Sequence, residues 1–420
     1  MWEHRGKVAY AGVGHAEVSR RWDEDPQTSI GALAIRAATR AIEDCGLRLE
    51  DIDGVFSSPG PLGDAWAPRE VPISMVERFQ MTPGDTEDGI AKVTAAWLAR
   101  NMGLKELKVC EDRYLIIGTL LNHAIDAVVA GRCSYALVVR PLNNFAGRYG
   151  QVGEAAAGEV RGPAQFEHPY GFTGPARFAS LFQRYLWKYN RRHEELADFV
   201  LNNRRNGLMC EYGYYYQNRP EPLTREEYLS ARWVTEPINL YDCDMPVHTA
   251  AAFILTTAER ARNLKHPPAF VLGHARTRHR ARSVTHSLED VEETNAAFAS
   301  RLYADAGVGP EDMQFANLYD GFTVVTPMWV EAFGLSGKGE GLPWMTAERI
   351  AIEGSFPLNT SGGSNGVGRT HGVSQHLDAV LQLQGRAGKR QVKNRDLCIA
   401  ESGPPPDAPG AQILCSAPGP

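Results

Sequence analysis

The chain has 420 residues, of which 43% are hydrophobic and 22% charged, and this composition fits a globular protein large enough for two hydrophobic cores. A formal net charge of -6 and an isoelectric point near 6.1 argue against a general nucleic-acid-binding surface. No apolar run approaches the roughly 20 residues of a membrane helix, the N-terminus lacks the apolar core of a signal peptide, and the seven cysteines lack metal-ligand spacing. We therefore expect a cytoplasmic protein with no membrane span, nucleic-acid partner or metal.

The first part of the chain alternates apolar strands with helical patterns. Ser29 stands where an N-cap is expected, and the helical pattern after it ends at Cys45-Gly46. The predicted strands cover residues 7–13, 52–57, 105–109 and 135–139, and the predicted helices cover 29–42, 91–102 and 114–129. This alternation predicts an α/β layered domain.

The amino-acid composition changes between about residues 143 and 241, which are rich in glycine, aromatic residues and arginine. Two helices are predicted there, at 175–189 and 194–206, and the stretch is interpreted as an inserted cap. Regular α/β texture then resumes, with predicted strands at 250–255, 269–274, 313–318 and 411–415 and a helix at 288–306. We predict two halves, residues 1–258 including the cap and residues 259–420.

Two motifs in the second half carry polar side chains at the ends of predicted strands. They are Tyr-Asp-Gly-Phe at 319–322, and Asn-Thr-Ser-Gly-Gly at 359–363 running on to Gly-Arg-Thr-His-Gly at 368–372. Their order and spacing resemble the catalytic half of the thiolase superfamily, in particular the branch related to the thiolase part of sterol carrier protein x. Residues 242–251 resemble a further family segment. The resemblance implies a duplicated thiolase fold, layered α-β-α-β-α.

The side chains on which thiolase chemistry depends are changed. Tyr319 stands where the family has Asn or His, and Arg369 stands where it has the His of Gly-His-Pro. Family spacing places Tyr114 at the position of the nucleophilic cysteine, and Cys110 lies four residues upstream on the preceding strand. A tyrosine with an ordinary pKa of about 10 is a poor acyl acceptor, so no acyl-enzyme is expected. Cys398 resembles the second family cysteine, although a small buried residue closing a strand is an equal interpretation.

The remaining polar groups suit a different reaction of CoA thioesters. Tyr319 and Arg369 can both donate hydrogen bonds to an enolate oxygen. Enolate stabilisation without an acyl-enzyme is what retro-aldol cleavage of a β-hydroxyacyl-CoA requires. The pattern resembles thiolase-like aldolases that shorten steroid side chains, which keep a Tyr-Asp-Gly-Phe-type motif with a catalytic tyrosine. Arg369 departs from their second tyrosine, and His371 could replace it as proton donor.

Other positions are expected to contact the substrate or its CoA part. They are Asp320, Gly362, Gly363, His248 and Cys398. Asp320 could instead cap the helix that follows it. The glycines are expected to form tight turns around a thioester, and His248, which replaces a family Asp, could shape the pocket. Arg369 could be a salt-bridge partner, and His371 could cap a helix.

We therefore predict a thiolase-fold aldolase acting on a β-hydroxyacyl-CoA with a bulky polycyclic or branched acyl group, without a cofactor beyond the CoA thioester. Two alternatives remain: an acyl-CoA C-acyltransferase using Cys398 or Cys110, and a degenerate thiolase-like subunit that only scaffolds a partner. The resemblance also implies a homodimer and a small zinc-ribbon and OB-fold partner that binds acyl-CoA.

Overall fold

The computed structural model describes residues 1–59, 89, 92–113, 115–144, 175–276, 287–405 and 409–418. Five strands form the first part of a mixed sheet: β1 (Val8–His15), β2 (Gly54–Ser57), β3 (Val109–Asp112), β4 (Tyr135–Leu142) and β7 (Thr249–Thr257). Their order is β3-β2-β4-β7-β1. Strand β2 is parallel to β3 and β4, whereas β7 is antiparallel to both of its neighbours.

The second part of the sheet repeats this topology. Its strands are β8 (Ala269–Arg276), β9 (Phe315–Asn317), β10 (Leu397–Ser402) and β11 (Gly410–Cys415), in the order β9-β10-β11-β8. Strand β11 is antiparallel to both neighbours, as β7 is, and a single parallel bridge at Leu358 occupies the position of the third strand beside β9. A short antiparallel pairing of β1 with β8 joins the two parts into nine strands.

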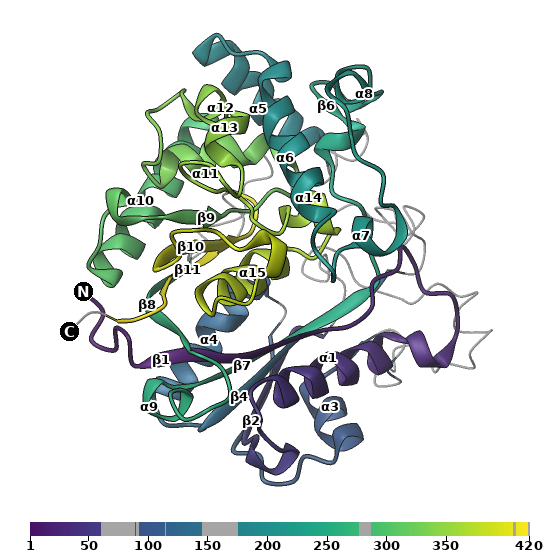
Figure 1. Ribbon diagram of the computed structural model, residues 1–420, viewed down its shortest axis with the longest axis vertical. Coiled ribbons are helices and arrows are strands. Elements are labelled where there is room, and N and C mark those ends of the chain that lie inside the picture. The colour runs from purple at the N-terminus through teal and green to yellow at the C-terminus, as the bar shows by residue number, and fades with distance from the viewer. Residues whose placement is uncertain are drawn as a thin grey trace, which may run out of the picture.

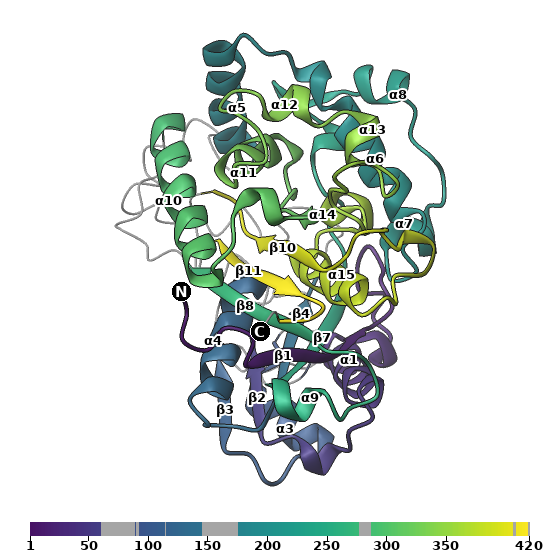
Figure 2. The ribbon, with the colours of Figure 1, turned by 60° about the vertical axis from the view of Figure 1, so that its left-hand side comes forward.

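Two helices lie between the two parts of the sheet (Figures 1 and 2). Helix α4 (Ile117–Val129) packs on β4, β7 and β11, and α15 (Val373–Leu383) packs on β10, β11 and α4. Nearly all positions of both helices are buried, as expected for helices covered on every side. Their apolar side chains join those of both sheet parts in one core.

Outer helices cover the remaining faces and complete the five layers. Helices α1 (Ile30–Asp44) and α3 (Ala95–Met102) cover the first part, and α10 (Leu288–Ala306) and α11 (Thr326–Ala332) cover the second. Figure 1 shows these pairs at opposite ends of the molecule. The duplicated, layered α/β architecture predicted from the sequence is therefore confirmed.

The described part of the insertion between β4 and β7 packs on the second half through two of its helices, and a third helix, Tyr214–Asn218, also bonds Val18 of the first half. Its described elements are α5 (Pro175–Tyr189), α6 (Ala197–Gly207), α7 (Tyr214–Asn218), α8 (Arg225–Leu229), β5 (Trp233–Thr235) and β6 (Ile238–Asn239). Helix α5 contacts α10, and α6 contacts the short helices α13 (Ala347–Ile350) and α14 (Gly363–Val367). The insertion thus brings residues of the first half close to the motifs of the second. The remaining short helices are α9 (Ala258–Ala261) and α12 (Gly341–Trp344).

Local sequence signals set several boundaries correctly. The Ser29 hydroxyl accepts a hydrogen bond from Ala32 N at 3.2 Å, which confirms the predicted N-cap. Helices α5 and α10 have the predicted bounds. The prediction for β3 was wrong, because apolar residues suggested 105–109 whereas the strand covers Val109–Asp112. Its position is set by backbone pairing with β2 at the sheet edge, where polar side chains are tolerated.

Candidate active site

The site is built around the turn that follows β9. The chain leaves the strand at Asn317 and enters the Tyr-Asp-Gly-Phe motif, whose side chains are buried. The end of the insertion pairs with this turn: Cys243 bridges Phe322, and Asp244 N donates to Gly321 O at 3.0 Å. This pairing places the Asp244 side chain next to that of Tyr319.

The Tyr319 hydroxyl and the Asp244 carboxylate both lie close to the Cα of Gly321. A Cβ at Gly321 would stand 2.3 Å from the Tyr319 Oη and 3.0 Å from the Asp244 Oδ2. A side chain at this position would therefore displace the Tyr319 phenol. Burial and the nearby Asp244 carboxylate raise the pKa of Tyr319, and Arg369 opposes them. The phenol is therefore a neutral proton donor at neutral pH.

Arg369 lies at the more open side of this pair. Its Nε is 4.0 Å from the Asp244 Oδ1, and its backbone N donates to Met245 O at 2.7 Å. The guanidinium side chain is 30% exposed, whereas that of Asp244 is 1% exposed. The cation thus closes the site toward solvent and keeps its charge next to the buried carboxylate.

His371 follows in a strained part of the same loop. Its φ is +51° and that of Gly372 is +88°, so two successive residues adopt the left-handed conformation that β-carbons disfavour. Within the described part of the chain, neither ring nitrogen has a hydrogen-bond partner, although both are buried. Burial, Arg369 and Arg140 lower the pKa of His371, so the imidazole is neutral. A buried imidazole with both nitrogens available is unusual and suits a functional group.

Asp320 points away from this cluster and caps a short helix. Its carboxylate accepts four N–H bonds: from Ser364 N at 2.7 Å, Gln375 Nε2 at 2.8 Å, Asn203 Nδ2 at 2.9 Å and Asn365 N at 3.2 Å. The structural alternative in the sequence analysis was a cap for the following helix, but the carboxylate caps α14 instead. Burial raises its pKa and these donors oppose the shift.

The two predicted glycines fit against protein, not against an open cavity. A Cβ at Gly362 would stand 2.4 Å from Asn203 O of α6, and one at Gly363 would stand 2.1 Å from the Asp320 Oδ2. Both have positive φ values. Their lack of a side chain lets α14 approach α6 and the Asp320 carboxylate.

The remaining predicted residues lie outside the cluster. Cys398 is fully buried in the core between the sheet parts, and burial raises its pKa. The His248 Nδ1 accepts from Asn144 N at 3.2 Å, and its Nε2 donates to Thr28 O at 2.9 Å. Both ring nitrogens are therefore hydrogen-bonded to backbone groups. Tyr114 lies outside the described residues.

The N-terminus of α4, where thiolases carry their nucleophile, is closed by the end of β10. Gly118 N donates to the Ser402 Oγ at 2.9 Å, and a Cβ at Gly118 would stand 2.2 Å from Gly410 O. Ser402 replaces one of the glycines that follow the second family cysteine. Its hydroxyl thus accepts one N–H of the first turn of α4.

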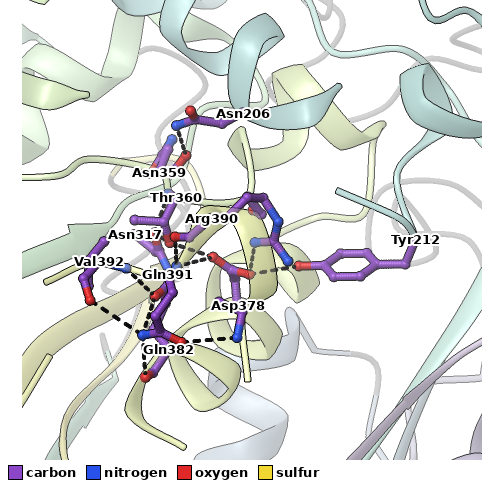
Figure 3. A network of polar contacts seen from close by, with 12 residues as sticks. Asn206, Tyr212, Asn317, Asn359, Thr360, Asp378, Gln382, Arg390, Gln391 and Val392 are labelled. Carbon is purple, nitrogen blue, oxygen red and sulfur yellow. Dashed lines mark hydrogen bonds and ion pairs between the residues drawn. The ribbon is translucent and has the colours of Figure 1, made fainter. Parts of the chain in front are cut away.

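A buried polar network supports the loop behind the site (Figure 3). Asn317 Oδ1 accepts from Thr360 N at 2.9 Å, the Thr360 hydroxyl donates to Asp378 of α15, and Asp378 forms an ion pair with Arg390. Asn359 Oδ1 accepts from Leu318 N at 2.7 Å, one residue before the catalytic motif. These bonds fix the strand end from which Tyr319 projects.

Comparison with known proteins agrees with this architecture. A family model described as Thiolase C-terminal domain-like matches residues 276–403. The chain is 28% identical over 395 residues to a steroid side-chain-cleaving aldolase of Thermomonospora curvata, covering 90% of this chain and 91% of that protein. It is also 28% identical over 393 residues to 17-hydroxy-3-oxo-4-pregnene-20-carboxyl-CoA lyase of Mycobacterium tuberculosis, covering 90% and 92%. The Ltp2-ChsH2(DUF35) aldolase matches with a TM-score of 0.77 at 25% identity, covering 98% of both chains. The chain is thus similar to thiolase-like proteins over most of its length, and its C-terminal part matches their family model.

Similarity to thiolase-like proteins does not establish that this chain has a reactive thiol. All seven cysteines are free, and the pKa of each is raised, mainly by burial. Cys110 is exposed on edge strand β3, and its pKa is raised as well. A thiol is activated by the opposite shift.

Two residues of this site were missed in the sequence analysis. Asp244 was noticed only as part of a resembling segment, because the pairing that brings it to Tyr319 is not local. Glu401 is fully buried, and its Oε2 accepts from Tyr319 N at 2.9 Å. Burial raises the pKa of Glu401 well above its ordinary value, so the side chain is a neutral acid. The available signal for Glu401 was a charged residue three positions after Cys398, which the sequence analysis placed at the end of a buried strand.

Proposed function

We propose that this protein is a thiolase-fold aldolase that cleaves a β-hydroxyacyl-CoA by a retro-aldol reaction. The observation that carries the proposal is the group formed by Tyr319, Asp244 and Arg369, in a chain whose thiols all have raised pKa values. The group can accept, hold and donate a proton beside a permanent positive charge. The two relatives named as a steroid side-chain-cleaving aldolase and as a CoA lyase, each matched over 90% of this chain, support the same reaction.

The chemistry needs proton transfer and enolate stabilisation. A proton leaves the β-hydroxyl, its O–H electron pair becomes the C=O bond of the carbonyl product, and the Cα–Cβ pair moves into the thioester to form an enolate. The Arg369 guanidinium stabilises the enolate oxygen in this partly dry site. A proton then returns to Cα and releases the shortened acyl-CoA. Electrons are redistributed within the substrate, so we propose no cofactor beyond the CoA thioester.

Acyl transfer is the less favoured alternative. It would require a nucleophilic thiolate, yet burial raises the pKa of Cys398, and the first turn of α4 donates to Ser402. A purely scaffolding role would leave the neutral, unpartnered His371 and the strained loop around it without a purpose.

We further propose the substrate class and the assembly. The names of the relatives favour a steroid or another bulky side-chain thioester. The Ltp2-ChsH2(DUF35) aldolase combines two components in its name, and this supports a small zinc-ribbon and OB-fold partner for this chain as well. We also propose a homodimer located in the cytoplasm. Among the described residues, no helix is long and apolar enough to cross a membrane.

The test is a panel of β-hydroxyacyl-CoA thioesters with steroid, branched and linear acyl groups, incubated with the protein alone and with a co-expressed partner of the proposed class. Mass spectrometry should find a ketone or aldehyde and a shortened acyl-CoA in equal amounts. Pretreatment with iodoacetamide should leave the rate unchanged. Thiol-dependent formation of a β-ketoacyl-CoA from two acyl-CoAs would instead identify an acyltransferase, and no turnover in any combination would favour the scaffold.

A further inference from the structure

The position of Asp244 suggests a specific part for it in the proposed reaction. Its Oδ2 and the Tyr319 Oη lie near the same point, 3.0 Å and 2.3 Å from where a Cβ of Gly321 would stand, and its Oδ1 is 4.0 Å from the Arg369 Nε. Two backbone hydrogen bonds hold the segment that carries Asp244. Asp244 N donates to Gly321 O at 3.0 Å, and Met245 O accepts from Arg369 N at 2.7 Å. These bonds fix the backbone from which the carboxylate projects beside the phenol.

The phenol alone cannot begin the reaction. Tyr319 is buried, and the surrounding carboxyl groups keep it protonated at neutral pH. A neutral phenol can take a proton from a β-hydroxyl only if it passes its own proton on at the same time. No hydrogen bond joins the Tyr319 hydroxyl to another described residue, so it is available to contact a substrate.

We propose that Asp244 is the proton acceptor behind Tyr319 in the retro-aldol step. This inference rests on the proposed function and names the group that Tyr319 needs. Asp244 acts through Tyr319, and it is therefore a positioning and proton-holding residue, not one that contacts the substrate. The gap between the two oxygens is closed by a small shift of the ring or by one water molecule, as is common before a substrate is bound.

The proton balance closes over one cycle. The β-hydroxyl proton moves to the Tyr319 Oη while the phenolic proton moves to the Asp244 Oδ2. After the Cα–Cβ bond breaks, Tyr319 gives a proton to Cα of the enolate and recovers one from Asp244. Both side chains end as they began, and Arg369 remains charged throughout.

Other charged or titratable groups near the phenol are less suited to this part. The groups whose charges act on the pKa of the phenol are Asp244, Arg369, Asp320 and Glu401, and Cys243 precedes Asp244 in the chain. Both oxygens of Asp320 accept N–H bonds, and the Glu401 Oε2 accepts from Tyr319 N. Among the described carboxylates, that of Asp244 shares the space over Gly321 with the phenol.

The test is a double-mutant cycle with pH profiles on a β-hydroxyacyl-CoA that the wild-type protein cleaves. Asp244→Asn keeps the shape of the side chain and should lower kcat about 100-fold at pH 7. Its residual kcat should rise about tenfold per pH unit between pH 7 and 9, because the rate then follows the fraction of phenolate formed by the solvent. In the Tyr319→Phe background, Asp244→Asn should cost less than about threefold more. Asp126→Asn removes a half-exposed carboxylate on α4 and is the matched control, with wild-type kcat.

Each outcome decides a separate point. A loss from Asp244→Asn that is the same with and without the Tyr319 hydroxyl would overturn the relay, and a flat pH profile would do the same. If His371→Asn, and not Asp244→Asn, shows the pH-dependent residual rate, the acceptor is the imidazole and the proposal is wrong. If Asp244→Asn fails to fold in a thermal melt, Asp244→Glu should retain at least about a tenth of kcat, and a complete loss with a normal melt would count against the relay. If the wild-type protein cleaves no member of the panel, the proposed function fails first, and the relay fails with it.

Discussion

At the scale of single residues, Tyr319 is the side chain on which the proposed reaction depends most directly. Tyr319→Phe removes one oxygen and should lower kcat at least about 100-fold with little change in melting temperature, because a positioned acid or base contributes on the order of 10²–10⁴ in rate. Steady-state rates and thermal melts test this. Tyr303→Phe is a matched control, since its hydroxyl donates to Phe333 O at 2.8 Å far from the site. The control should lose about 0.5–1.5 kcal/mol of stability and keep its turnover. Near wild-type turnover of Tyr319→Phe would contradict the role.

Glu401 and Asp320 are both buried carboxyl groups, and burial raises the pKa of each. They differ in that Asp320 accepts four N–H bonds. The pKa of Glu401 is raised in the folded protein, so folding favours its protonated form, and wild-type stability should fall as pH rises above the unfolded value of about 4.5. Glu401→Gln cannot ionise, and its stability relative to wild type should increase from pH 4 to pH 8 in urea unfolding. Asp320→Asn would turn an amide N–H₂ toward N–H donors and should cost about 1–3 kcal/mol. A pH-independent difference between Glu401→Gln and wild type would show that folding does not raise the pKa of Glu401.

At the scale of elements, helix α15 is tied to the loop behind the site by the bond from the Thr360 hydroxyl to Asp378, and Asp378 is also paired with the buried Arg390 (Figure 3). Arg390→Met leaves a buried carboxylate without its cation and should cost about 3–5 kcal/mol of stability. Arg395→Met removes one bond, from the Arg395 Nη1 to Leu383 O at 2.7 Å, and should cost about 0.5–1.5 kcal/mol. Urea unfolding of both variants gives the comparison. Equal losses would mean that the ion pair adds nothing beyond an ordinary hydrogen bond.

The sequence predicts elements well where a periodic apolar pattern and a cap agree, as for α1, α5 and α10. It fails at β3, whose pairing with β2 is a backbone property. For the site, motif order and spacing led to Tyr319, Arg369 and His371, which the fold places near one another. Asp244 could not be predicted as their neighbour, because its position depends on how the insertion returns across the second half. Nor could local sequence reveal that backbone groups occupy both nitrogens of His248.

At the scale of the whole molecule, two copies of one topology are joined in one sheet, and Ser402 at the end of β10 accepts an N–H from the first turn of α4. The pKa values of Cys110 and Cys398 are both raised, mainly by burial. We therefore expect no covalent acyl-enzyme. Intact-protein mass spectrometry after incubation with acyl-CoA should find only the unmodified mass. A biosynthetic thiolase with its cysteine intact, treated in parallel, provides the positive control. A stable adduct mapped to Cys110 or Cys398 would support acyl transfer instead.

The crossing of the insertion from the first half onto the second has a consequence for the order in which the protein folds. Asp244 reaches Tyr319 only after the strands of both halves have formed and the returning segment has paired at Phe322. Contacts between residues so distant in sequence carry a large loop-closure cost and form late. In a refolding experiment, the far-ultraviolet helical signal should therefore recover before enzymatic activity does. Recovery of activity would then mark the last stage of folding. A protein with native-like secondary structure could still be inactive.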